Sequence, residues 1–166
     1  MKQLGHQEVI NKKQYKELVV VTENIRTPEN VGMLFRISEA FGVSKVFLIG
    51  DSPNLENKKV IRTARNTEKQ LKINLFVDSQ EVITKLKKEK YQLIGLELTY
   101  ASKSLQSVDF LEYDRIALFV GAERFGIAKS TLLQLDQIVH IDLFGKNSSI
   151  NVVNAVGIAL YEINRN

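Results

Sequence analysis

Short hydrophobic runs recur along the chain, and within each run apolar residues occupy successive positions instead of alternating with polar ones. A strand that is apolar on both faces is typical of a parallel sheet covered by helices on both sides. The runs are also rich in valine and isoleucine, which favour strands. They predict strands at Glu17–Thr22, Lys45–Ile49, Tyr91–Leu96, Arg115–Val120 and Gln137–Ile141, with a weaker strand at Leu71–Val77.

Helical patterns fill the intervals between these runs, at Val31–Phe41, Ser79–Lys90, Ser130–Leu135 and about Asn151–Asn164. This alternation of strands and helices predicts an α/β fold, with a mostly parallel sheet flanked by helices. The last helix carries apolar residues on nearly every turn, which is more than one sheet face needs. We therefore expect it to be buried twice, against its own sheet and against a second subunit.

Length and composition fit a single domain, because 166 residues, 44% of them hydrophobic, can enclose a core and no repeat or linker divides them. We expect one domain over residues 1–166, with residues 1–17 as a short basic extension. The net charge of +4 mildly favours a polyanionic partner. The absence of cysteine excludes disulfides, thiolate metal sites and a cysteine nucleophile, and no metal is expected. Without a signal-peptide core or a long apolar run, the sequence predicts a cytoplasmic protein with no membrane partner.

A first polar segment, Glu23–Gly42, follows the first predicted strand and opens a helix. Asn30 is a suitable residue to cap the free N–H groups at the start of that helix. Arg36 interrupts an otherwise apolar helix, so its guanidinium must reach an anion, a carboxylate or solvent. A structural ion pair and an anion-binding site are both open interpretations of this arginine.

A second segment, Leu118–Gly126, runs from a strand directly into a turn that contains two glycines. Gly121 would let a ligand approach the backbone closely, and Gly126 would permit a positive φ angle. Glu123 lies between them and, taken alone, could be a turn or helix-cap carboxylate.

A third segment, Gly145–Glu162, places a small polar loop before the last helix. Helix capping explains one or two of its polar residues. Four polar residues within five positions exceed that need and predict a binding loop; they are Asn147, Ser148, Ser149 and Asn151.

In this order and at these spacings, the three segments resemble the motifs of the SpoU/TrmH family of SPOUT RNA methyltransferases. The resemblance covers about Leu18 to Ile163, and in it Asp142 stands where relatives commonly carry proline. The matching residues are Asn30 and Arg36 of the Asn-x-x-x-x-x-Arg pattern, Gly121, Glu123 and Gly126 of the glycine–glutamate turn, and Ser149, Ile150 and Asn151 of the Ser-hydrophobic-Asn helix start.

The resemblance implies a SPOUT α/β-knot, in which the C-terminal third forms a deep trefoil knot, and a homodimer in which the last helix packs against its partner. It also implies transfer of a methyl group from S-adenosylmethionine (SAM) to a ribose 2′-OH of RNA. By the same resemblance, the residues that bind the cofactor are Leu96, Gly121, Ile141, Ser149 and Ile150.

The resemblance makes Arg36 the catalytic arginine. Because a guanidinium stays protonated, we favour a clamp on the neighbouring phosphate that also stabilises the developing alkoxide, and leave open its role as general base. Asn30, Glu123, Ser149 and Asn151 would hold Arg36, the ribose and the methyl donor in register. A non-catalytic RNA-binding knot protein is the alternative, and the presence of these residues disfavours it.

The RNA substrate is either tRNA or rRNA. Many relatives carry an N-terminal RNA-binding domain, and the residues before Glu17 are too few for one, which favours a small structured target such as a tRNA loop. The basic residues expected on the RNA-binding surface are Arg26, Arg62, Arg65, Lys69 and Arg124.

Overall fold

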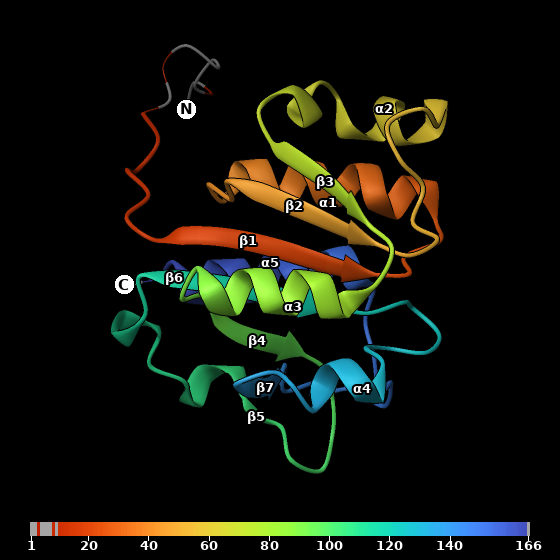
Figure 1. Ribbon diagram of the computed structural model, residues 1–166. Helices are drawn as coiled ribbons and strands as arrows, with labels where there is room; N and C mark the ends of the chain where they lie inside the picture. Colours follow the sequence, from red (N-terminus) through yellow and green to blue (C-terminus); the bar gives the residue numbers. More distant parts are fainter. Residues whose placement is uncertain (1–2, 4–7, 9, 166) are drawn as a thin grey trace.

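The computed structural model describes residues 3, 8 and 10–165 and contains a seven-stranded sheet in the order β3-β2-β1-β6-β4-β7-β5 (Figure 1). Every pairing between these strands is parallel, which confirms the predicted sheet. The strands are β1 (Glu17–Glu23), β2 (Lys45–Ile49), β3 (Lys72–Phe76), β4 (Gln92–Leu96), β5 (Lys103–Ser104), β6 (Arg115–Val120) and β7 (Gln137–His140).

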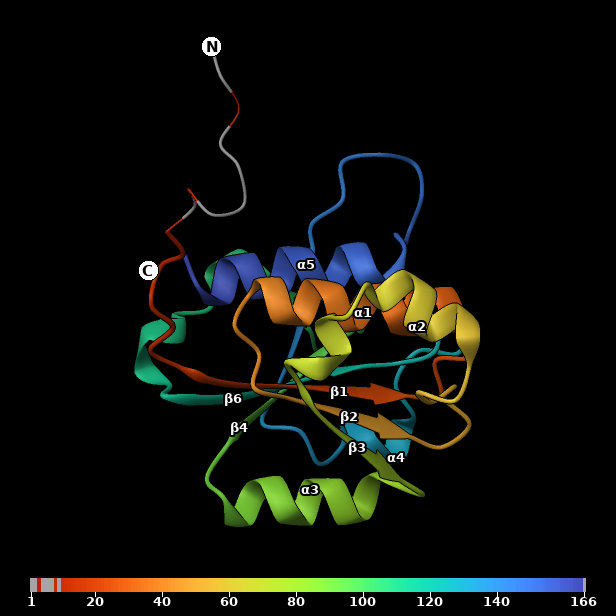
Figure 2. The same ribbon diagram turned by 90° about the horizontal axis from the view of Figure 1, so that it is seen from above.

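Helices cover both faces of the sheet, with α1, α2 and α5 on one side and α3 on the other (Figure 2). The α-helices are α1 (Pro28–Ala40), α2 (Lys58–Ala64), α3 (Ser79–Lys88), α4 (Lys129–Leu132) and α5 (Val152–Ile163), and the short 3₁₀ helices are η2 (Thr67–Lys69), η3 (Leu105–Ser107) and η4 (Phe110–Glu112). The predicted α/β fold is therefore confirmed, and the threading of the chain into a knot stays a prediction from the family resemblance.

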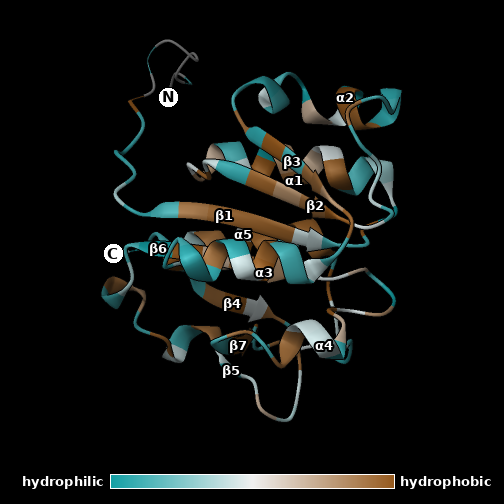
Figure 3. Ribbon diagram, in the orientation of Figure 1, coloured by the Kyte–Doolittle hydropathy of each residue, from teal (hydrophilic) through white to brown (hydrophobic). Residues whose placement is uncertain are grey.

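Two apolar layers explain why the strand sequences do not alternate. Successive residues of a strand point to opposite faces, so Val20 of β1 packs beneath α1 and α5, together with Phe35 and Val156. The next residue, Val21, packs on the other face with Leu86 of α3. Figure 3 shows that the central strands are largely apolar along their length. Both faces of the central strands are thus buried.

The last helix, α5, buries its inner side against the sheet, as the sequence predicts, through Val153, Val156, Ala159, Leu160 and Ile163. Its outer side remains accessible and carries two large apolar residues, Ile158 at 44% exposure and Tyr161 at 63%. The second burial, against another subunit, remains a prediction.

Several local predictions differ from the structure: strand β5 is not among those predicted, and α1 begins at Pro28 instead of Val31. Helix α2 has no counterpart among the predicted helices, because its seven residues bury only Val60 and Ala64 and so give too short an apolar pattern. The helix expected at Ser130–Leu135 ends already at Leu132. Of the expected extension at residues 1–17, positions 1–2, 4–7 and 9 lie outside the described residues. No helix in the described part of the chain is both long and apolar enough to cross a lipid bilayer.

Candidate active site

The three sequence motifs meet at one edge of the sheet. Because β1, β6 and β7 lie in one parallel sheet, their carboxyl ends reach the same edge. The segment after β1 leads into α1, the segment after β6 forms the Gly121–Ile127 loop, and the segment after β7 leads into α5. In parallel α/β sheets ligands bind outside this edge.

A continuous chain of hydrogen bonds joins the three motifs through Asn30. The Nδ2 of Asn30 donates to Oε1 of Glu123 at 2.6 Å, and the Nδ2 of Asn151 donates to Oδ1 of Asn30 at 3.2 Å. Asn30 is buried, with 7% of its surface exposed. Its amide therefore holds residues from three distant segments in fixed positions.

The expectation that Asn30 caps helix α1 is wrong. The helix begins at Pro28 after Thr27, and Asn30 already lies inside the first turn. Proline is suited to the first helical position because its φ angle is preset and it lacks the N–H that would need a cap. The side chain of Asn30 is consequently available to Glu123 and Asn151.

Asn151 is the residue of the third motif that caps a helix. Its Oδ1 accepts a hydrogen bond from the backbone N–H of Val153 at 2.8 Å, at the start of α5. Capping uses the oxygen of this amide and leaves its nitrogen to bind Asn30. One side chain thus fixes the helix start and the hydrogen-bonded chain.

The loop between Gly121 and Ile127 folds back on itself. Gly126 has the positive φ angle that the sequence predicts, at 66°, and its N–H donates to the carbonyl of Ala122 at 2.8 Å. A Cβ atom on Gly121 would lie 1.9 Å from the carbonyl carbon of Gly126. The absence of a side chain at Gly121 therefore lets the loop close, and the approach of a ligand to its backbone stays a prediction.

A cavity of about 370 Å³ opens beside this loop, between the ends of β4 and β7 and the start of α5. Four of the five residues expected to bind the cofactor line it, namely Leu96, Ile141, Ser149 and Ile150. Gly121 is absent from its lining. The remaining lining residues are Glu97, Leu98, His140, Asp142, Leu143, Asn147, Ser148 and Ala155.

Glu97, His140 and Asp142 were not identified as site residues from the sequence. The available signal was their position, since each stands at or directly beyond the end of an apolar strand. Two of them are held by polar contacts: the Nδ1 of His140 lies 2.9 Å from Oγ of Ser102, and its Nε2 lies 3.4 Å from Oδ1 of Asp142. Ser104 donates to the other oxygen of Asp142.

Arg36 stands apart from this network. It lies on the exposed side of α1, and within the described part of the chain it has no hydrogen-bond or ion-pair partner. The structural ion pair that the sequence left open is thus not formed with any described residue. The guanidinium is free to bind an external anion, and it forms no hydrogen bond or ion pair with Asn30, Glu123, Ser149 or Asn151.

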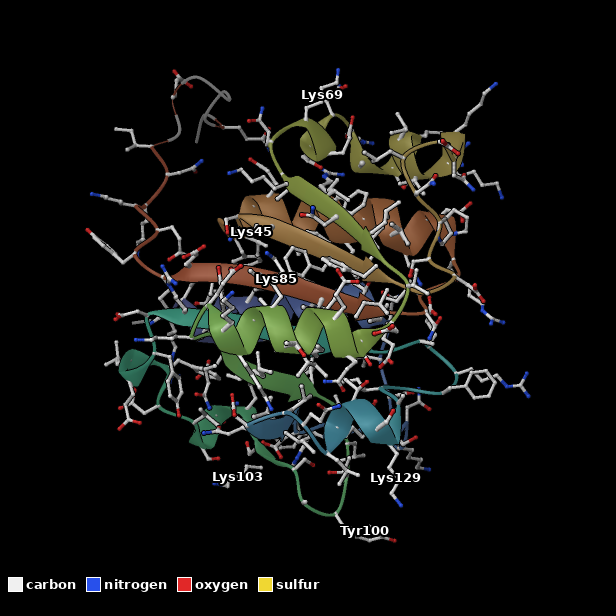
Figure 4. All side chains as sticks on the ribbon, viewed as in Figure 1. Lys45, Lys69, Lys85, Tyr100, Lys103 and Lys129 are labelled. Carbon is white, nitrogen blue, oxygen red and sulfur yellow. The ribbon has the colours of Figure 1, made fainter. Side chains whose placement is uncertain are left out.

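The expected RNA-binding residues lie in three places. Arg26 and Arg124 lie on the motif loops: Arg26 pairs with exposed Asp51 at 3.3 Å, and the guanidinium of Arg124 lies 5.6 Å from the ring of Phe125. Arg62 and Arg65 are exposed on and directly after α2, which packs beside α1. Lys69 lies before the start of β3, away from the motif loops (Figure 4).

The parallel sheet, the cavity and the hydrogen-bonded polar groups at one edge define an α/β protein built to bind a ligand at the carboxyl ends of its strands. The chain belongs to the SpoU rRNA Methylase family, whose sequence pattern matches residues 17–161.

Similar proteins include a 23S rRNA (guanosine-2'-O-)-methyltransferase, RlmB, of Xylella fastidiosa, which is 28% identical over 87% of this chain. A tRNA (guanosine(18)-2'-O)-methyltransferase of Thermus thermophilus is 24% identical over 96% of it. The chain spans 57% of the Xylella protein and 79% of the Thermus protein. The AdoMet-bound rRNA methyltransferase of Sinorhizobium meliloti has the same fold, with a TM-score of 0.83 at 22% identity over 92% of this chain and 57% of its own.

Proposed function

We propose that this protein is a SAM-dependent RNA methyltransferase, in a single domain, that transfers a methyl group to a ribose 2′-OH. The observation that carries the proposal is the chain from Asn151 through Asn30 to Glu123, which joins all three family motifs beside one cavity. The relatives from Xylella and Thermus are both 2'-O-methyltransferases by name, which supports the same reaction here.

The residues that line the cavity suit S-adenosylmethionine, which supplies an activated methyl group on a sulfonium. Leu96, Ile141 and Ile150 offer apolar surface for an adenine ring, while Ser149 and the neighbouring backbone offer hydrogen bonds. Glu97 adds a carboxylate to the lining, and this suits hydroxyl groups or a positive charge on the ligand. The Sinorhizobium structure contains bound AdoMet, which is another abbreviation for S-adenosylmethionine, and this supports the same cofactor here.

In this proposal Arg36 binds the phosphate next to the target ribose and stabilises the alkoxide as the 2′-OH loses its proton. A guanidinium keeps its charge at any physiological pH, which suits electrostatic stabilisation better than proton abstraction. Asn30, Glu123, Ser149 and Asn151 hold the ribose and the methyl donor in line. Alignment of this kind lowers the barrier by several kcal/mol.

We further propose tRNA as the substrate in preference to rRNA, and therefore a location in the cytoplasm. The Thermus relative, a tRNA (guanosine(18)-2'-O)-methyltransferase by name, aligns with 96% of this chain. Arg26 and Arg124 lie on the motif loops, where they can reach phosphates around the target nucleotide. Contacts of this type weaken steeply as salt concentration rises.

The proposed assembly is a homodimer through the outer side of α5. Ile158 and Tyr161 are exposed there, and Met33 of the neighbouring α1 adds further apolar surface at 38% exposure. Sedimentation at micromolar concentration should show a dimer, and Ile158→Glu should convert it to a monomer. A stable monomer of the unchanged chain would contradict the assembly.

The test of the reaction is methyl transfer from labelled SAM into total tRNA and, separately, into ribosomal RNA, followed by nuclease digestion to identify the product. A 2′-O-methylated nucleoside in the tRNA pool is the expected result. Incorporation into rRNA alone would correct the substrate and keep the reaction. No incorporation into either pool, despite measurable SAM binding, would favour the non-catalytic RNA-binding alternative.

A further inference from the structure

Glu97 connects the cofactor cavity to the loop that carries Glu123. It follows the last residue of β4 and lines the cavity. Its Oε2 accepts a hydrogen bond from the N–H of Ile127 at 3.0 Å, and its Oε1 accepts one from the N–H of Leu98 at 3.1 Å. Its own N–H donates to the carbonyl of Val139 at 2.9 Å, which fixes its backbone between two strands. One carboxylate therefore touches the cavity and the loop.

Gly126 leaves the space that this carboxylate fills. A Cβ atom on Gly126 would lie 2.2 Å from Oε2 of Glu97. The N–H of the same glycine donates to the carbonyl of Ala122, which closes the turn that contains Glu123. A shift of Ile127 therefore shifts Glu123 as well. The glycine at this position is explained by its φ angle and also by the carboxylate packed against it.

A second carboxylate binds Ala128, the residue that directly follows this loop. The Oε2 of Glu23 accepts from the N–H of Ala128 at 3.1 Å, and its Oε1 accepts from the hydroxyl of Thr131 at 3.1 Å. Glu23 is buried and does not line the cavity. The consecutive N–H groups of Ile127 and Ala128 are thus bound by two carboxylates, and of these Glu97 is the one that lines the cavity.

We propose that Glu97 is a positioning residue for methyl transfer, which couples occupation of the cofactor cavity to the position of the Gly121–Ile127 loop. A carboxylate has about four lone-pair sites, and two of those on Glu97 are used within the protein. The others face a ligand that offers hydroxyl groups or a positive charge. A ligand bound to these sites fixes the position of the Glu97 carboxylate, and the carboxylate in turn fixes the N–H group of Ile127. The loop is then held where Glu123 accepts the hydrogen bond from Asn30. This inference rests on the proposed SAM-dependent function.

Because the sequence contains no tryptophan, the fluorescence of one introduced tryptophan can be used to measure this coupling. Phe125 is 78% exposed on the loop, so Phe125→Trp places the chain's single tryptophan there, and excitation at wavelengths that tyrosine does not absorb isolates its emission. We expect SAM to change the tryptophan emission of this variant. In Phe125→Trp/Glu97→Gln, SAM should still bind by calorimetry but leave the emission unchanged, because the amide presents an N–H group to one of the two backbone donors.

The kinetic counterpart is a fall in kcat of Glu97→Gln by about tenfold or more with little change in the KM for RNA, since misplacement of a reacting group lowers turnover. Asp142→Asn in the Phe125→Trp background is the matched control. Asp142 lines the same cavity, but its oxygens contact His140 and Ser104 and not the loop. This control should keep the emission change.

Three outcomes would overturn the coupling: no emission change in Phe125→Trp with SAM bound, an unaltered change after Glu97→Gln, or an equal loss after Asp142→Asn. If circular dichroism shows that Glu97→Gln does not fold, amide exchange at Ile127 of the unchanged chain decides: slower exchange with SAM supports the coupling and an equal rate overturns it. Failure of the unchanged chain to bind SAM would instead refute the proposed function.

Discussion

The polar side chains at the two ends of the sheet differ in whether they are paired within the protein. At the amino end, Glu17 at the start of β1 accepts hydrogen bonds at Oε1 from Tyr91 at 2.5 Å and Lys45 at 3.0 Å, and its Oε2 pairs with Arg115 at 3.2 Å. Lys45 is further paired with Glu89 at 3.9 Å, and Figure 4 shows it beside the strand starts. At the carboxyl end, a cavity lined by polar and apolar residues stays open, and on the exposed side of α1 Arg36 has no partner among the described residues.

Because of this difference, we expect the amino end of the sheet to contribute to stability and the carboxyl end to function. The strands between the two ends are apolar, so charged and amide groups gather where the strands begin and end. At the amino end opposite charges satisfy one another and fix the starts of neighbouring strands. At the carboxyl end, polar groups that fix the positions of site residues, such as Asn30, are hydrogen-bonded within the protein. Other polar groups there remain available to a ligand. Substitutions at the two ends should therefore affect different measurements.

The largest effect is expected from Arg36→Ala. Turnover in methyl transfer should fall by about a hundredfold or more, because a charge that stabilises the transition state is removed. SAM affinity and the midpoint of thermal unfolding should stay unchanged, because Arg36 is exposed and has no partner among the described residues. The measurements are single-turnover transfer, calorimetry and a thermal melt. Lys87→Ala, which removes an exposed cation on α3, is the control and should leave all three unchanged. Near-normal turnover of Arg36→Ala would refute its assigned role.

A smaller loss of activity is expected from Asn30→Asp. This change places a carboxylate where the amide donated to Glu123 at 2.6 Å, so two negative charges would face each other. We expect turnover at neutral pH to fall by about tenfold to a hundredfold, from a misplaced Glu123. Activity should partly recover as pH falls and the pair takes up a proton. A pH–rate profile parallel to that of the unchanged chain would contradict this explanation.

The behaviour of Asn30 also shows where sequence reasoning succeeds and fails. The strands at β2 and β6 could be predicted to the residue, because a run that is apolar on both faces has few other interpretations. The local rule that makes asparagine a helix cap failed at Asn30, because its partners Glu123 and Asn151 are far away in sequence. Glu97 could not be found either, since its bond to Ile127 exists only because β4 and β6 are neighbours in the sheet. The order of the strands in the sheet is a property of the tertiary structure, and the hydrophobic periodicity of the sequence does not determine it.

At the amino end, Glu17→Gln should lower the free energy of unfolding without affecting the site. The carboxylate is about one-third exposed at 34%, so screening by solvent limits its ion pairs, and we expect a loss of about 1 to 2 kcal/mol. Urea unfolding measures it, and SAM affinity measured in parallel should not change. A fall in SAM affinity would show that the two ends are coupled and would contradict the separation described above.

The same variant predicts a pH dependence of stability, which is the smallest of the expected effects. Hydrogen bonds from Tyr91 and then Lys45 hold the pKa of the Glu17 carboxyl below its usual 4.5. A lowered carboxyl pKa stabilises the folded chain above pH 4.5, and this stabilisation is lost as pH falls through the lower folded-state pKa. The difference in unfolding free energy between the unchanged chain and Glu17→Gln should therefore be constant near neutrality and shrink in acid. Urea unfolding in steps from neutral pH down to the acid limit of reversibility measures both curves. If they stay parallel into acid, the ionised carboxylate is not what stabilises this end of the sheet, and the hydrogen bond from Tyr91, which a glutamine can also accept, would account for it instead.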